Sequence, residues 1–308
     1  MYIGPIFAII ILHAFTKEGH TMTPSGKHVI RGSFIPDNSQ ETRDLQTKQM
    51  LNRLEAFAGS DNFQGVLESV HALLRINGAL DRDLCTIVFK HIKSALHSKR
   101  VEIREWHQLV DVNRNRPAMI EFPQFTIGCI QNDVDEFCRQ IVELLDMYLI
   151  PSVKDTMLKC SLMGLRADYL RYMAEFTGSA RCRRPVATRS LQGYIDAEDY
   201  CRNTVGLGDT SEVILGILLN RSVLEYEILH DKQAASRTCL RAMERAHASP
   251  TGLARLFNAP QELNAAAICV LQSITRNSES WDLVISKDNT EDDWIVCDFE
   301  GPTQGRQK

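Results

Sequence analysis

The feature that most constrains the fold is a helical spacing of apolar residues that continues through most of the chain. Between Asn62 and Ile76, Val66, Val70 and Leu73 fall at three- and four-residue steps and so line one face of an amphipathic helix. Strand-like alternation is nearly absent. The pattern predicts an all-α fold of about nine helices, near residues 41–57, 62–76, 82–107, 131–150, 152–176, 189–205, 210–230, 232–247 and 260–278.

The helical pattern forms one block, residues 41–281, between two segments of different composition. Residues 1–40 start with an apolar run, Ile3 to Phe15, which is shorter than the roughly 20 residues of a membrane span. A signal peptide remains an alternative, although no Lys or Arg precedes the run. Residues 282–308 are polar and acidic, which is typical of a disordered tail. We expect a single helical domain with a leader, a tail and no membrane partner.

Charge and cysteine content narrow the partners and the location. The chain has 35 Lys plus Arg against 39 Asp plus Glu, a formal charge of −4. Nucleic-acid-binding proteins usually carry a basic excess, so no nucleic-acid partner is expected. The nine cysteines are scattered without a C-x-x-C motif, which argues against a zinc site or a disulfide framework. A reduced location, in the cytoplasm and also in the nucleus, fits this pattern.

The sequence lacks the motifs of common catalytic sites. G-x-S-x-G, H-E-x-x-H and G-x-x-x-x-G-K-[ST] do not occur. We therefore expect no enzymatic activity, no cofactor and no metal.

The most informative segment is Asp168-Tyr-Leu-Arg-Tyr-Met-Ala-Glu175. On a helix, Asp168, Arg171, Tyr172 and Glu175 fall at steps of three and four and share one face. An Arg held by carboxylates beside a Tyr hydroxyl is a donor group suited to phosphate. Taken alone, the same pattern is also typical of a helix face with ordinary salt bridges.

This segment resembles the 14-3-3 signature YYRYLAE, and other segments resemble the family in the same order. Residues 84–100 (LCTIVFKHIKSALHSKR) resemble LLSVAYKNVIGARRASW, and residues 142–151 (VELLDMYLIP) resemble VLSLLEKFLIP. Residues 213–229 (VILGILLNRSVLEYEIL) resemble LGLALNFSVFYYEIL, and residues 267–281 resemble TLIMQLLRDNLTLW. The resemblance extends over about residues 41–281 and implies nine antiparallel helices in an L-shaped bundle with an amphipathic groove.

The resemblance also implies a function and a site. Family members are adaptors that bind phosphoserine or phosphothreonine segments of partner proteins, and most are dimers. With segment 84–100 aligned as above, the phosphate-binding positions are Lys90, His97, Arg171 and Tyr172. The peptide-binding positions carried over are Leu219, Asn220, Val223, Glu227, Val270, Asn277 and Trp281.

In this alignment the chain departs from the family pattern. His97 stands where the family has a second Arg, and a neutral imidazole offers one donor in place of a charged fork. Lys93 and Lys99 are nearby cations that could compensate. Ser273 and Ser280 replace Leu in the groove wall. Positions of the family's dimer ion pairs are also changed, so a homo- or heterodimer remains open. The alternative function is a helical interaction scaffold that has lost its dependence on phosphate.

Overall fold

The computed structural model describes residues 40–177, 180–208, 211–248 and 261–281. Within these ranges the regular structure is entirely helical, which confirms the predicted all-α class. The N-terminal leader up to residue 39 and the tail from residue 282 lie outside the described residues. None of the described helices combines the length and the apolar content that crossing a membrane requires.

The described residues form nine continuous helical segments when α5, η1 and α6 are taken as one and α9 and η2 as another. The elements are α2 (Gln40–Gly59), α3 (Phe63–Asn77), α4 (Arg82–Val112), α5 (Pro117–Leu144), η1 (Leu145–Leu149), α6 (Ile150–Ser152), α7 (Thr156–Phe176), α8 (Ala180–Asn203), α9 (Glu212–Val223), η2 (Leu224–Ile228), α10 (Lys232–Ala248) and α12 (Gln261–Ser280).

Helix starts follow local capping chemistry. The side chain of Asp81 accepts a hydrogen bond from the amide of Leu84 and so caps α4, and Asp155 caps α7 by accepting from Met157 and Leu158. A short acceptor at this position satisfies backbone donors that have no partner within the helix.

Two helices start earlier than the sequence pattern predicted. α5 begins at Pro117, where the missing proline N–H is not needed, and it continues through the buried Pro123. α8 similarly passes through Pro185. A proline inside a helix costs one hydrogen bond, but tertiary packing can hold the helix together across it.

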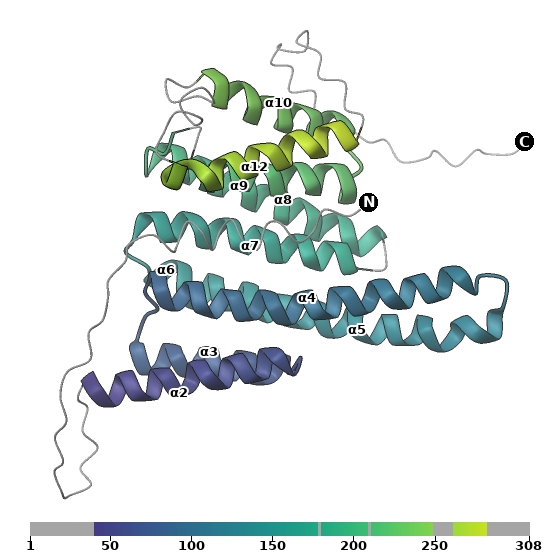
Figure 1. The fold of residues 1–308 in the computed structure, drawn as a ribbon, viewed down its shortest axis with the longest axis horizontal. Coiled ribbons are helices and arrows are strands. Elements are labelled where there is room, and N and C mark those ends of the chain that lie inside the picture. The colour runs from purple at the N-terminus through teal and green to yellow at the C-terminus, as the bar shows by residue number, and fades with distance from the viewer. Residues whose placement is uncertain (1–39, 178–179, 209–210, 249–260, 282–308) are drawn as a thin grey trace, which may run out of the picture.

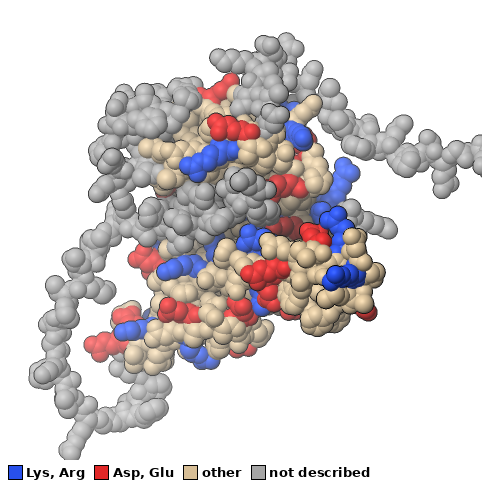
Figure 2. Space-filling model, turned by 45° about the vertical axis from the view of Figure 1, so that its right-hand side comes forward, with Lys and Arg blue, Asp and Glu red and all other residues tan. Residues whose placement is uncertain are grey.

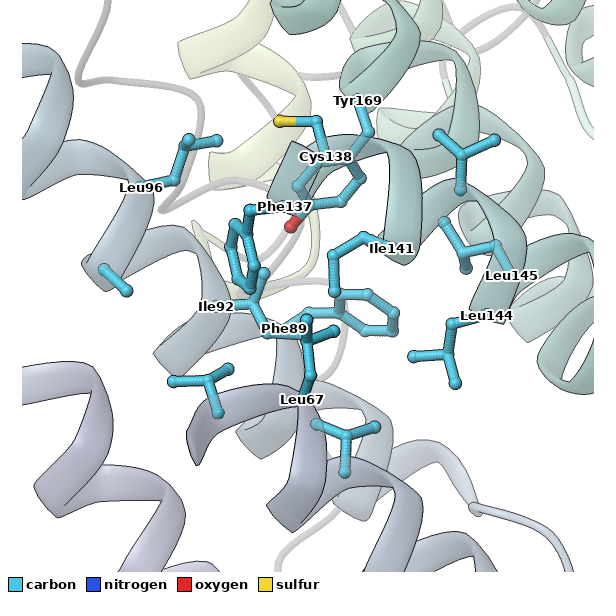
Figure 3. Close-up of a cluster of buried hydrophobic side chains, with 14 of the residues drawn as sticks. Leu67, Phe89, Ile92, Leu96, Phe137, Cys138, Ile141, Leu144, Leu145 and Tyr169 are labelled. Carbon is cyan, nitrogen blue, oxygen red and sulfur yellow. The ribbon is translucent and has the colours of Figure 1, made fainter. Parts of the chain in front are cut away.

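The helices stack as antiparallel layers (Figure 1). The α2–α3 pair lies beside the longer α4–α5 pair, α7 and α8 follow, and α9, α10 and α12 form the far layer. One buried apolar cluster fills the space between α2, α3, α4, α5 and α7, and a second lies between α7, α8, α9, α10 and α12. Figure 3 shows part of the first cluster, in which Phe89, Phe137, Ile141 and Tyr169 converge.

α7 contributes to both clusters and therefore links the two halves of the fold. Leu165, Tyr169 and Leu170 belong to the first cluster, whereas Cys160 and Ala167 belong to the second. Because both sides of α7 are packed, the polar side chains on its remaining face are held in fixed positions.

Candidate functional site

The centre of the candidate site is a chain of hydrogen bonds around Arg171 on α7. Arg171 Nε donates to the hydroxyl of Tyr194 on α8 at 3.3 Å, and this hydroxyl donates to Asp168 Oδ1 at 2.6 Å. Asn220 Nδ2 on α9 donates to the same oxygen at 2.7 Å. Three helices thus fix the orientation of one guanidinium group.

The neighbouring Tyr172 provides an aromatic surface between two arginines. The guanidinium carbon of Arg171 lies 4.5 Å from the centre of the Tyr172 ring, and that of Arg100 lies 4.9 Å from it. Cation–π contact of this kind keeps two like charges close together. Arg171 is only 6% exposed, so its charge acts where water screens it poorly.

α4 supplies two further cations opposite this face of α7. Arg100 Nη2 lies 3.0 Å from both carboxylate oxygens of Glu175. Lys93 is half-buried, and burial lowers the pKa of its ammonium group, while Asp168 raises it and Arg171 lowers it further. Lys93 and Arg100 are seven residues apart, so they lie within about 20° of each other around the helix.

The α4 cations that lie against the Arg171–Tyr172 face of α7 are Lys93 and Arg100, a different pair from the Lys90 and His97 of the sequence alignment. Lys90 and His97 are both exposed, and helical geometry turns them by about 40–80° from Lys93 and Arg100. Neither belongs to the group around Tyr172. Shifting the alignment of α4 by three residues, which is close to one helical turn, preserves the apolar pattern of the helix. Apolar spacing therefore does not separate the two alignments.

A charge signal in the sequence could have revealed this shift. The family segment LLSVAYKNVIGARRASW has a Lys followed six and seven residues later by Arg-Arg. Lys93 is followed at the same spacing by Lys99 and Arg100. The substitution of Arg by His at position 97 disappears in this alignment, because an Arg stands at the equivalent position.

The residues expected to contact a peptide backbone differ in exposure. Leu219 and Val270 are 2% and 0% exposed and belong to the second apolar cluster, as the plain-core interpretation of such residues predicts. Asn220 and Asn277 are buried as well. Val223 is half-buried.

A pocket of about 620 Å³ continues from Glu175 toward the end of α12. Glu227 and Trp281 line it, together with Tyr226 and Arg183, which the sequence did not single out. Tyr226 stacks on Trp281 with ring centres 4.3 Å apart. Burial raises the pKa of Glu227, Glu175 adds to the rise, and Arg171 and Arg100 oppose it.

The arrangement is chemically suited to holding an anion next to an extended chain. Lys93, Arg100 and Arg171 present N–H donors. Glu175 orients Arg100, and the Tyr194 hydroxyl, which donates to Asp168, orients Arg171. Planar guanidinium forks match the oxygen geometry of phosphate. Among the residues that the structure describes, no cluster of His, Cys, Asp and Glu suits a metal ion.

The family comparison agrees with this geometry. The sequence model described as "14-3-3 protein" matches residues 55–282. The 14-3-3-like protein D of Nicotiana tabacum is 24% identical over 247 residues, covering 80% of this chain and 95% of the relative. The checkpoint signal transducer rad24 of Schizosaccharomyces pombe is 23% identical over 252 residues, covering 81% and 87%. The 14-3-3 protein homolog of Trichoderma harzianum is 27% identical over 215 residues, covering 68% and 78%. Because the family match spans well over half of its length, this chain belongs to the 14-3-3 family.

Proposed function

We propose that this protein is an adaptor that binds phosphoserine- or phosphothreonine-containing segments of partner proteins, rather than an enzyme. The observation that carries the proposal is the convergence of Lys93, Arg100 and Arg171 beside Tyr172, with both arginines already oriented by their neighbours. Signalling in the cytoplasm or nucleus is the setting that fits such a role.

Charge and preorganisation explain why phosphate is the preferred ligand. A phosphate group carries a charge of about −1.5 to −2 and three strong acceptor oxygens. Each charge-assisted hydrogen bond contributes about 1.5–3 kcal/mol, and fixed arginines lose little conformational entropy on binding. An unphosphorylated serine or threonine hydroxyl would offer the cations neither this negative charge nor these three acceptor oxygens.

The bound segment would continue in extended form toward the pocket beside Trp281. Asn220 and Asn277 are suited to pairing with its main chain, because an amide side chain can both donate and accept. Glu227 and the Tyr226–Trp281 stack would then border the peptide residues on one side of the phosphorylated residue.

A titration with paired peptides tests the proposal. Fluorescence anisotropy would compare a phosphoserine peptide, with Arg before the phosphoserine and Pro two residues after it, with its unphosphorylated twin. We expect at least about 100-fold tighter binding of the phosphopeptide, since two charged hydrogen bonds are at stake. Equal affinities would refute the adaptor role and favour the scaffold without phosphate dependence.

We also propose that the protein self-associates through the hairpin end formed by α4 and α5. Leu109, Val112, Met119, Phe122 and Phe125 are all exposed there. Figure 2 brings this side forward and shows uncharged surface at the hairpin end together with charged side chains, and Asp111 and Arg114 form an ion pair there. An exposed apolar patch is a common feature of protein interfaces, and a second copy would bury it. In this interface, apolar contacts take the place of ion pairs.

A further inference from the structure

α7 and α8 pack closely enough for their backbones to be nearly in contact. Ser190 Oγ on α8 donates a hydrogen bond to the backbone carbonyl of Ala167 on α7 at 2.8 Å. A Cβ atom added at Gly193 would lie 3.2 Å from the Cβ atom of Ala167. These contacts define the register of the two antiparallel helices.

The same register brings Cys160 and Cys201 face to face. Cys160 lies seven residues before Ala167, and Cys201 lies eight residues after Gly193, about two turns along each helix in opposite directions. Both side chains are 0% exposed and belong to the second apolar cluster, and each thiol shifts the pKa of the other. Two buried thiols from neighbouring helices therefore lie on the same α7–α8 seam.

A small cavity adjoins Cys160. Cys160 lines a pocket between α7, α8 and α9, together with Gly164 and Asn220. Its volume of about 20 Å³ is enough for one water-sized molecule. The neighbouring Cys201 thiol lowers the pKa of Cys160, and Cys160 raises that of Cys201, so Cys160 is the thiol more easily converted to a thiolate.

Cys138 is an equally buried cysteine in a different environment. Its side chain is 0% exposed, and burial raises its pKa, with Asp135, Arg100 and Glu175 as the charged groups that act on it. No second thiol is among these groups. Cys138 therefore serves as an internal reference for a buried thiol without a thiol partner.

We propose that Cys160 and Cys201 form a reversible intrachain disulfide when hydrogen peroxide, the smallest hydroperoxide, reaches Cys160 at the α7–α9 cavity. The Cys160 thiolate attacks one oxygen of hydrogen peroxide, the O–O bond breaks, and the leaving hydroxide takes up a proton to become water. The Cys201 sulfur then attacks the resulting sulfenic acid. Its S–O bond breaks, and water leaves with the proton of Cys201. Overall, two thiols lose two electrons to form the disulfide, and hydrogen peroxide is reduced to two water molecules.

The bond would tie α8 to α7 two turns away from Tyr194 and Asp168. An S–S bond of about 2.05 Å joins helices that already touch, so little backbone movement is required. In a reducing compartment such a bond is transient and is reversed by thiols. This inference does not depend on phosphopeptide binding.

Peptide mapping of the full chain tests the proposal. The folded protein would be treated with hydrogen peroxide, alkylated, digested without reductant and analysed by mass spectrometry. We expect a Cys160–Cys201 linked peptide, whereas Cys138 should be recovered as a free thiol. The oxidised protein should melt about 5 °C or more above the reduced one, and dithiothreitol should reverse the rise.

A variant separates the two steps and gives a clear negative outcome. Cys201→Ser should accumulate a sulfenic acid at Cys160 that dimedone traps, because the second thiol is missing. If the variant does not fold, the mapping of the wild-type protein decides the question by itself. The proposal is wrong if no Cys160–Cys201 peptide forms while the exposed Cys129 and Cys182 are fully oxidised, or if it forms only in unfolding concentrations of urea.

Discussion

Arg100 on α4 and Glu175 on α7 form an ion pair in which one guanidinium nitrogen lies 3.0 Å from each of the two carboxylate oxygens. The two residues are 75 positions apart in sequence, and their ion pair joins α4 to α7. It also holds the Arg100 guanidinium over Tyr172, which places it beside Arg171. Together these contacts favour Lys93 and Arg100 as the α4 cations of the candidate phosphate site.

Neutralising Lys93 should weaken phosphopeptide binding much more than neutralising Lys90. Lys93→Met removes a cation next to Arg171 but keeps the length of the side chain, and one lost charged hydrogen bond corresponds to about 10- to 100-fold in Kd. Lys90→Met changes an exposed position of the same helix and should alter Kd by less than about threefold. Anisotropy titrations would measure both. The reverse order would restore the alignment that uses Lys90 and His97.

Removing the hydroxyl of Tyr194 should destabilise the fold. In Tyr194→Phe the buried carboxylate of Asp168 loses a donor at 2.6 Å, and Arg171 Nε loses its acceptor. Leaving such groups unsatisfied costs about 1–3 kcal/mol in the free energy of unfolding. Urea denaturation monitored by circular dichroism would measure the loss. Tyr148→Phe, at a side chain that is 54% exposed, should change stability by less than about 0.5 kcal/mol.

The close approach of α7 and α8 predicts opposite effects for two glycine substitutions. Gly193→Ala places a methyl group 3.2 Å from Ala167 and should destabilise by about 1–3 kcal/mol. Gly128→Ala introduces a methyl group where no atom lies within 4 Å, so the gain in helix propensity should stabilise by up to about 1 kcal/mol. Thermal unfolding of both variants checks the contrast. Equal effects would mean that the α7–α8 seam is less tight than the structure indicates.

The sequence alone was sufficient for the fold class and for the central face of α7. Periodicity located the helices because apolar residues at three- and four-residue steps must share a buried face. The same spacing grouped Asp168, Arg171, Tyr172 and Glu175 correctly. Short segments with matching order then identified the family.

The register of α4 could not be derived from the spacing of its apolar residues. Lys90 with His97 and Lys93 with Arg100 are both cationic or titratable pairs seven residues apart. A three-residue shift changes neither the seven-residue spacing nor the amphipathic pattern. The two pairs are separated by the charge pattern, in which Lys99 and Arg100 follow Lys93, and by the contact of Arg100 with Glu175 on another helix. The sequence analysis did not single out Tyr194 for a similar reason. Its hydrogen bonds to Arg171 and Asp168 depend on the packing of α7 against α8, which a local pattern does not reveal.

Stability should depend on pH through Glu227. Burial raises the pKa of this carboxyl, so the folded protein keeps the proton to a higher pH than the unfolded chain does. Raising the pH through that window therefore lowers the free energy of unfolding. Glu227→Gln removes the titration and should gain stability relative to the wild type between pH 4 and pH 7. Urea midpoints at both pH values would measure this, with the exposed Glu121→Gln as a control.

Self-association should depend on the aromatic residues at the start of α5. Phe122 and Phe125 are 66% and 70% exposed, and Phe122 meets Trp106 edge-to-face at 5.9 Å. The double variant Phe122→Asp/Phe125→Asp adds charge where an interface would exclude water, at a cost that should abolish pairing. Light scattering coupled to gel filtration should show a dimer for the wild type and a monomer for the variant, with helical content unchanged. Tyr148→Asp, which also alters an exposed aromatic residue but outside this patch, should remain dimeric. A wild-type monomer at micromolar concentration, or a variant that still dimerises, would rule out this hairpin end as the interface.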